Sequence, residues 1–295
     1  MSFSKEQIAV RVSRNTIVIN ALLAVFMLAA AFYAHSAAIL SDAVNTISDV
    51  FSTFIVIIGV KMASKKADKE HPYGHERFEC VSAIILAIIL GATGISIGYS
   101  GVNNIAAGNH EALAVPGVFA LIAAVVSIFT KEGLYRYTKA VANKIESGAL
   151  KADAWHHRSD ALSSIGSLLG VVGARMGFPV LDSVACIVIS FFVVKAALDI
   201  FMDAVGKMTD RACDEETEAA IRELVLAQKN VMGVDLLNTR IFGDKIYVDV
   251  EILLDGNTTL FDSHKVAHTV HDAIEQNFAK VKHCMVHTNP SNAKS

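Results

Sequence analysis

Long apolar segments alternate with short polar ones over the first two thirds of the chain. Six of these segments are long enough to cross ~30 Å of bilayer hydrocarbon as helices. They cover approximately residues 12–34, 39–62, 78–102, 115–137, 150–172 and 180–202. The pattern predicts a transmembrane domain of six helices.

A different pattern begins near Cys213, where charged residues become frequent. Acidic residues at 214–216 predict the start of a helix that runs to about residue 228. A strand near 236–242, the turn Gly243-Asp244 and an alternating segment at 245–254 predict a hairpin. A helix that follows Asp262 or Ser263 and runs to about residue 278 precedes a last strand at 281–288.

This order of elements predicts a small two-layer α+β domain with both helices on one face of the sheet. The expected fold is therefore an α-helical membrane protein with six transmembrane helices, followed by a cytoplasmic αββαβ domain of ferredoxin or metallochaperone type. The predicted boundaries are 1–207 for the transmembrane domain and 208–295 for the cytoplasmic domain.

Basic residues lie in the N-terminal tail and in the loops after the second and fourth segments, whereas the alternate loops contain only Arg175. Because cytoplasmic loops carry an excess of Lys and Arg, both termini are predicted to be cytoplasmic. The basic residues that carry this prediction are Lys5, Arg11, Arg14, Lys61, Lys65, Lys66, Lys69, Arg77, Lys131, Arg136, Lys139, Lys144 and Lys151.

Composition agrees with a membrane protein, since 53% of residues are apolar, 19% are charged and the mean hydropathy is +0.45. From Cys213 onward, 13 acidic residues outnumber 8 basic ones, and this region holds five of the eleven histidines. An acidic, histidine-rich domain favours cation binding over nucleic-acid binding. The four cysteines are scattered and predict neither a disulfide framework nor a zinc ribbon.

Two pairs of polar residues, each spaced by four, lie inside the apolar segments: Asn45 with Asp49, and His156 with Asp160. This spacing places each pair on one helix face. A charge at the bilayer centre costs at least ~2.5 kcal/mol, so such residues usually serve ions or protons. Facing each other, the pairs would supply four ligands for a divalent transition metal. The alternatives are hydrogen bonding between helices and the use of His157 in place of His156, although only His156 lies four residues from Asp160.

A second cluster, Asp68, His71 and His75, lies in the loop between the second and third segments. Pro72 and Gly74 predict a tight turn that brings both imidazoles toward Asp68. The alternative is an ordinary solvated polar loop.

Metal-ligating residue types also recur in the tail, where the alternative is again ordinary solvated side chains. Three histidines share a helix stripe, two share a strand face, and two acids share the face of the alternating strand. These residues are His264, His268 and His271; His283 and His287; and Asp249 with Glu251.

A further candidate is an ion pair between Arg77, which begins the third segment, and Asp210, which follows the sixth. Such a pair would hold the helices to the tail, and it is costly to break if it is partly buried. The alternative is two exposed charges that contribute little.

Enzyme classes find little support. No GxxxxGK[ST] loop is present, so an ATP-driven pump is not expected, and His75-Glu-Arg-Phe-Glu79 fails the HExxH motif of metalloproteases. A cation channel and a non-transporting metal sensor remain as alternatives to a transporter.

Three motifs together resemble the cation diffusion facilitator family: Ser41-Asp-Ala-Val-Asn-Thr-Ile-Ser-Asp49, His71-Pro-Tyr-Gly-His75 and His156-His-Arg-Ser-Asp160. With six spans and an α+β tail, the resemblance covers nearly the whole chain. It implies a homodimer in the plasma membrane that exports a divalent metal ion, zinc, manganese or iron, from the cytoplasm in exchange for protons.

The resemblance also assigns residues. It implies a transport site at Asn45, Asp49, His156 and Asp160, where the family usually has Asp or His at the position of Asn45. A neutral amide oxygen favours manganese or iron, whereas His156 suits zinc. The loop site Asp68, His71 and His75 matches without substitution. In the tail the chain has Val234, Glu251 and Asn289 where the family pattern has ligands, which leaves a weaker site built from Asp249 or Glu251 with His264 and His287.

Overall fold

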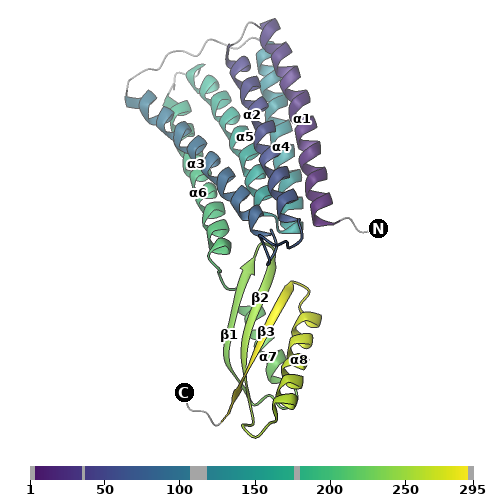
Figure 1. Ribbon diagram of the computed structural model, residues 1–295. Helices are drawn as coiled ribbons and strands as arrows, with labels where there is room; N and C mark the ends of the chain where they lie inside the picture. Colours follow the sequence, from purple (N-terminus) through teal and green to yellow (C-terminus); the bar gives the residue numbers. More distant parts are fainter. Residues whose placement is uncertain (1–3, 35–36, 107–117, 176–179, 292–295) are drawn as a thin grey trace. The chain divides into compact units, whose positions relative to one another are not determined.

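The computed structural model describes residues 4–34, 37–106, 118–175 and 180–291. The chain divides into two compact units, Met1–Val205 and Gly206–Ser295 (Figure 1).

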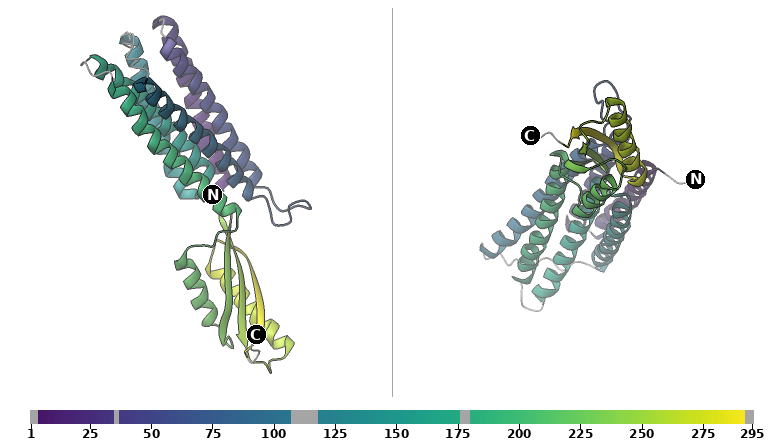
Figure 2. Two further views of the ribbon diagram at one scale, coloured as in Figure 1. Left: turned by 90° about the vertical axis from the view of Figure 1, so that its left-hand side faces the viewer. Right: turned by 90° about the horizontal axis from the view of Figure 1, so that it is seen from below.

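The first unit consists of long α-helices that run alongside one another (Figure 2). Each helix contains its predicted apolar segment, except that the start of the fourth segment, at 115–117, lies outside the described residues. The helices are α1 (Lys5–Ala34), α2 (Ala37–Ala63), α3 (Arg77–Ala106), α4 (Val118–Ile145), α5 (Gly148–Arg175) and α6 (Val180–Met208).

Three of these helices are long and apolar enough to cross a membrane when only described residues are considered: Lys5–Tyr33, Asp42–Ala63 and Arg77–Ala106. The predicted helical membrane domain is thereby confirmed, while the number of six spans stays a prediction. Polar residues in α4 and α5 pair across the helix interface, where Arg158 Nη1 donates to both carboxylate oxygens of Glu132 at 2.8 and 2.9 Å.

Small residues allow α3 and α6 to lie side by side (Figure 1). A Cβ atom added at Gly94 would lie 2.9 Å from Val193 Cγ1, so a larger residue would push the helices apart. The Ser190 hydroxyl on α6 uses this proximity and donates to the Gly94 carbonyl at 2.7 Å.

The second unit has the predicted αββαβ order, which confirms the fold class of the tail. Its elements are α7 (Glu215–Leu226), β1 (Gly233–Phe242), β2 (Lys245–Leu254), α8 (Leu260–Asn277) and β3 (Val281–Pro290). The sheet order is β1-β2-β3, with β1 antiparallel and β3 parallel to β2. Gly243 makes the predicted hairpin turn at a φ of 66°, a conformation that glycine adopts without strain.

The start predicted for α8 was wrong by a few residues. Thr259 is the N-cap, and its hydroxyl accepts a hydrogen bond from the Asp262 backbone N–H at 3.2 Å. The helix therefore begins at Leu260. Asp262 lies in its first turn, where the positive end of the helix dipole stabilises a carboxylate.

Both helices of the tail pack on one face of the sheet. Alternate residues of β2 from Ile246 to Leu254 are buried against Ile221 of α7 and Ile274 of α8. Of the residues between them, which point to the opposite face, Tyr247 is also buried, whereas Asp249, Glu251 and Leu253 are only partly buried. The period of two in β2 thus separates the apolar core from a mixed sheet face that carries both acids.

We expect Ile274→Ala to destabilise the tail by about 2–5 kcal/mol, because Ile274 is completely buried and its truncation leaves a cavity. Hydrogen exchange of the β2 amides in the full-length protein measures this loss. The matched control is Leu260→Ala on the same helix, since Leu260 is 86% exposed and its truncation should change stability by less than ~0.5 kcal/mol. Equal losses in the two variants would contradict the assigned core.

Candidate metal-binding site

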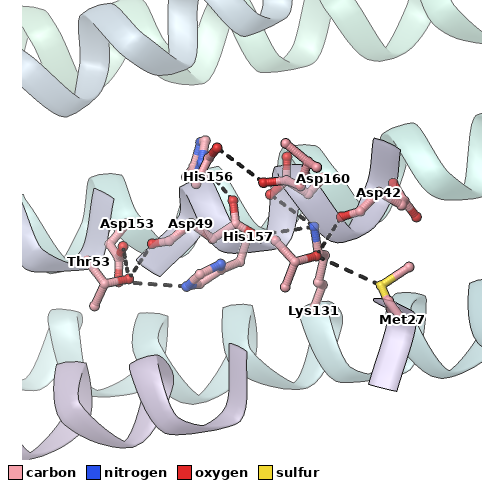
Figure 3. A network of polar contacts seen from close by, with 12 residues as sticks. Met27, Asp42, Asp49, Thr53, Lys131, Asp153, His156, His157 and Asp160 are labelled. Carbon is pink, nitrogen blue, oxygen red and sulfur yellow. Dashed lines mark hydrogen bonds and ion pairs between the residues drawn. The ribbon is translucent and has the colours of Figure 1, made fainter. Parts of the chain in front are cut away.

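Three residues with metal-ligating side chains lie close together between the helices of the first unit. Asp49 comes from α2, whereas His156 and Asp160 lie one turn apart on α5. Each offers a ligand atom within 4.8 Å of the other two, and all three are buried. His156 Nε2 lies 3.2 Å from Asp49 Oδ1 (Figure 3). A tetrahedral metal with bonds of ~2.1 Å holds its ligand atoms roughly 3.4 Å apart, so this pair already has a suitable spacing.

A third helix, α4, adds a cation to this group. The ammonium of Lys131, on α4, lies 3.2 Å from Asp49 Oδ2 and 3.4 Å from Asp160 Oδ2. Lys131 has no exposed surface. The placement of Lys131 in a loop after the fourth span was therefore wrong, and the reason is physical: two buried carboxylates need a counter-charge. The basic residues at 136, 139 and 144 also lie within α4.

Asn45 occupies the position one helical turn before Asp49, but its side chain is exposed. The atoms that lie against Asp49 come from Lys131 and His156. That Asn45 completes the transport site stays a prediction.

A second buried polar group, which sequence reasoning missed, adjoins the first. Thr53 Oγ1 lies 3.0 Å from Asp153 Oδ1 and 3.1 Å from the Asp49 carbonyl oxygen. His157 Nε2 lies 3.7 Å from Asp153 Oδ2, and both side chains are fully buried (Figure 3). His157 thus faces Asp153, while His156 faces Asp49. The spacing of four between Asp153 and His157 is the signal in the sequence that could have revealed this pair.

The loop residues Asp68, His71 and His75 form a second group of three ligands, again within 4.8 Å of one another. The two imidazole rings lie 4.4 Å apart, and Gly74 permits the turn with a φ of 103°. The backbone N–H groups of His71 and Glu70 donate to Asp68 Oδ1 at 2.8 and 3.0 Å and hold the pKa of this exposed carboxyl below its usual range. Asp68 is therefore ionised, as a metal ligand must be.

The hydrogen bonds of His75 prepare one of its nitrogens for a metal. Nδ1 lies 3.1 Å from the Lys66 carbonyl oxygen, which can only accept, so Nδ1 carries the proton. When the ring is neutral, Nε2 presents a lone pair 3.3 Å from Asp68 Oδ2. Two acceptors at this distance repel each other unless a proton or a metal ion lies between them.

The predicted tail residues do not converge in this way within one chain. Among the described residues, the tail holds no group of three His, Cys, Asp or Glu ligand atoms within 4.8 Å. Glu251 instead accepts a hydrogen bond from Asn289 Nδ2 at 2.9 Å, and Asp249 lies 3.9 Å from Arg240. His264 and His287 lie on α8 and β3. A tail site stays a prediction.

The predicted ion pair also stays a prediction. Arg77 begins α3 in the first unit and Asp210 lies in the second, so the pair would join the two units.

Comparison with known proteins shows the family of the chain. Residues 15–208 match the cation efflux transmembrane domain, and residues 213–291 match the cation efflux protein cytoplasmic domain. The chain belongs to the cation diffusion facilitator family. It is therefore a multi-pass membrane protein of a metal efflux family, with a tail of the cytoplasmic type.

The matches to curated relatives cover most of the chain. An uncharacterized transporter of Methanocaldococcus jannaschii is 33% identical, and the match covers 92% of this chain and 95% of that protein. Metal tolerance protein C1 of Arabidopsis thaliana is also 33% identical, over 87% of this chain but only 57% of that protein. Manganese efflux system protein MneS of Bacillus subtilis is 28% identical over 88% of each chain.

We expect Asp68→Ala to reduce divalent metal binding by the full-length protein by about one ion per chain, because Asp68 contacts both imidazoles of the loop group. Equilibrium dialysis with Zn²⁺ at pH 7 measures the stoichiometry. Glu70→Ala is the matched control, since Glu70 is exposed in the same turn and contributes only its backbone to Asp68. Unchanged stoichiometry and affinity in Asp68→Ala would show that the loop group does not hold a metal.

Proposed function

We propose that this protein exports a divalent transition metal ion from the cytoplasm by antiport with protons. The observation that carries the proposal is the buried group of Asp49, His156 and Asp160, which lies inside a helical membrane domain. Carboxylates and an imidazole are the ligands of such ions, and they are rare in membrane helices unless they serve transport.

Proton coupling follows from the chemistry of the ligands. Metal ions bind only deprotonated carboxylates and neutral imidazole, so metal and protons compete for the same atoms. His156 and at least one of the two carboxylates would carry protons inward after the metal has left on the outer side. Imidazole suits this role because its ordinary pKa of ~6.5 lies within the physiological range.

The proposed architecture assigns residues 1–207 to transport and residues 208–295 to dimerisation and metal sensing. The protein would work as a homodimer in the plasma membrane, with both termini in the cytoplasm. The match of residues 213–291 to the cytoplasmic domain of cation efflux proteins supports the position of the tail. Without Lys131, four basic residues in the adjoining parts of α4 and α5, Arg136, Lys139, Lys144 and Lys151, still support this orientation.

Zinc, manganese and iron are all compatible with the proposed ligands, and we favour manganese or iron. Asn45 offers a neutral and hard amide oxygen, which suits these ions better than zinc. The relative MneS is named for manganese efflux, and this supports the same choice.

Asp49→Ala should abolish metal uptake into proteoliposomes that carry an imposed pH gradient, while the protein remains folded. Asp49 contacts both His156 and Lys131, so its loss removes the residue that joins α2 to the site. Asp199→Ala is the control, because Asp199 is an exposed acid on α6 and lies outside this group. Normal transport by Asp49→Ala would disprove the site, and metal flux without any proton flux would favour a channel.

Asn45→His should shift transport toward zinc relative to manganese, because an imidazole replaces a hard amide oxygen. Competition between Zn²⁺ and Mn²⁺ for uptake measures the ratio of the two rates. Ser48→His on the same helix is the control. Ser48 is also exposed, but unlike Asn45 it does not lie four residues from Asp49. An equal ratio in the parent and Asn45→His would exclude Asn45 from selectivity.

A further inference from the structure

We propose that Lys131 is a tethered competitor of the transported metal. Its ammonium occupies the carboxylates of Asp49 and Asp160 when the metal is absent, and an entering ion must displace it. This inference rests on the proposed function and adds the residue that sets how tightly the site holds its ion.

The first argument is steric. The ammonium nitrogen lies 3.2 and 3.4 Å from the Oδ2 atoms of Asp49 and Asp160. A metal that binds the same two oxygens lies about 2.0–2.2 Å from each of them. Both cations cannot approach these oxygens together, because the ammonium would then be in contact with the ion. An ion that takes these two oxygens, rather than Asp49 Oδ1 beside His156, therefore displaces Lys131 from at least one of its ion pairs.

The second argument is charge. Two carboxylates balance the two charges of a divalent ion, which leaves a nearby ammonium without compensation and repelled by the metal. Without the metal, the same ammonium stabilises two buried carboxylates that would otherwise repel each other. Either the metal or Lys131 thus compensates the charge of the carboxylates at a given time. The lysine stays charged in both states.

The third argument concerns the residue type and its surroundings. Lysine carries a compact charge on a flexible four-carbon stem, whereas the planar guanidinium of arginine binds carboxylates in a fixed fork. Asp42, two turns before Asp49 on α2, also interacts electrostatically with Lys131. We assign Asp42 as the acid that keeps Lys131 paired while the metal occupies the site.

A tethered competitor has a kinetic benefit. A site of buried carboxylates and imidazole that bound its ion without opposition would release it slowly, because dissociation sets most affinity differences. A lysine that returns to the carboxylates replaces the departing ion, so the site is never left with unpaired charges. Lys131 would accordingly weaken equilibrium binding and accelerate turnover.

The test compares Lys131→Met with the parent in the full-length protein, using titrations with Mn²⁺ and Zn²⁺. Binding that depends on Asp49 is obtained by subtraction of the Asp49→Ala isotherm, which removes the contribution of other sites. We expect Lys131→Met to bind more tightly, within the range of about 5- to 150-fold that is typical of coupled sites. Its uptake into proteoliposomes should show a lower KM and a lower maximal rate.

Two further variants make the comparison specific. Lys131→Arg keeps the charge and should bind metal no more tightly than the parent. Asp42→Asn removes the alternative partner and should weaken metal binding. Lys139→Met is the matched control on α4, because Lys139 contacts Tyr135 and not the metal group, and it should leave metal affinity unchanged.

Equal or weaker metal binding by folded Lys131→Met, in a parent that transports metal, would overturn this inference alone. A parent that neither binds nor moves metal through Asp49 would overturn the proposed function, and the inference with it. If Lys131→Met does not fold, structures of the parent with and without Mn²⁺ decide. We expect the ammonium to lie beyond 4 Å from one or both carboxylates when the metal is bound, and retention of both ion pairs would disprove displacement.

Discussion

The buried carboxylates of Asp49 and Asp160 impose the constraint on which the helical unit depends. An unpaired charge in such surroundings costs several kcal/mol, so each ionised carboxylate needs a cation beside it. In the structure this cation is Lys131, with the imidazole of His156 on the other side of Asp49. The charges therefore hold α2, α4 and α5 together around one point.

The surrounding contacts support this arrangement. Between α4 and α5, Arg158 Nη1 donates to both carboxylate oxygens of Glu132, which lies one residue beyond Lys131 along α4. Between α2 and α5, Thr53 contacts Asp153, three residues before His156. Each helix that supplies a charged group to the site is thus fixed to a neighbour close to that group. Such contacts hold ligands in position far better than a loop would.

The sequence predicts what lies within one helix much better than what lies between helices. Spacing of four placed His156 and Asp160 on one face, and the cost of a buried acid singled out Asp49. Lys131 was misjudged because a count of basic residues along the chain does not show which of them point inward. Its position within the predicted fourth span was the available signal. Contacts such as Thr53 with Asp153 span 100 residues and follow only from the packing of the helices.

The loop group and the helical group contain the same residue types, Asp and His. They differ in what surrounds their carboxylates before a metal would bind. In the loop, Asp68 is exposed and its negative charge is stabilised by backbone N–H groups, with the two imidazoles beside it. A metal can bind there by displacing water or a proton. In the helices, the two carboxylates are already paired with one buried ammonium, so metal binding would exchange one cation for another. On the proposed function, exchange would suit a site that must release its ion in every cycle, whereas an open loop would suit retention. The same pair of residue types, Asp and His, would then serve two purposes according to whether a basic residue is buried with them.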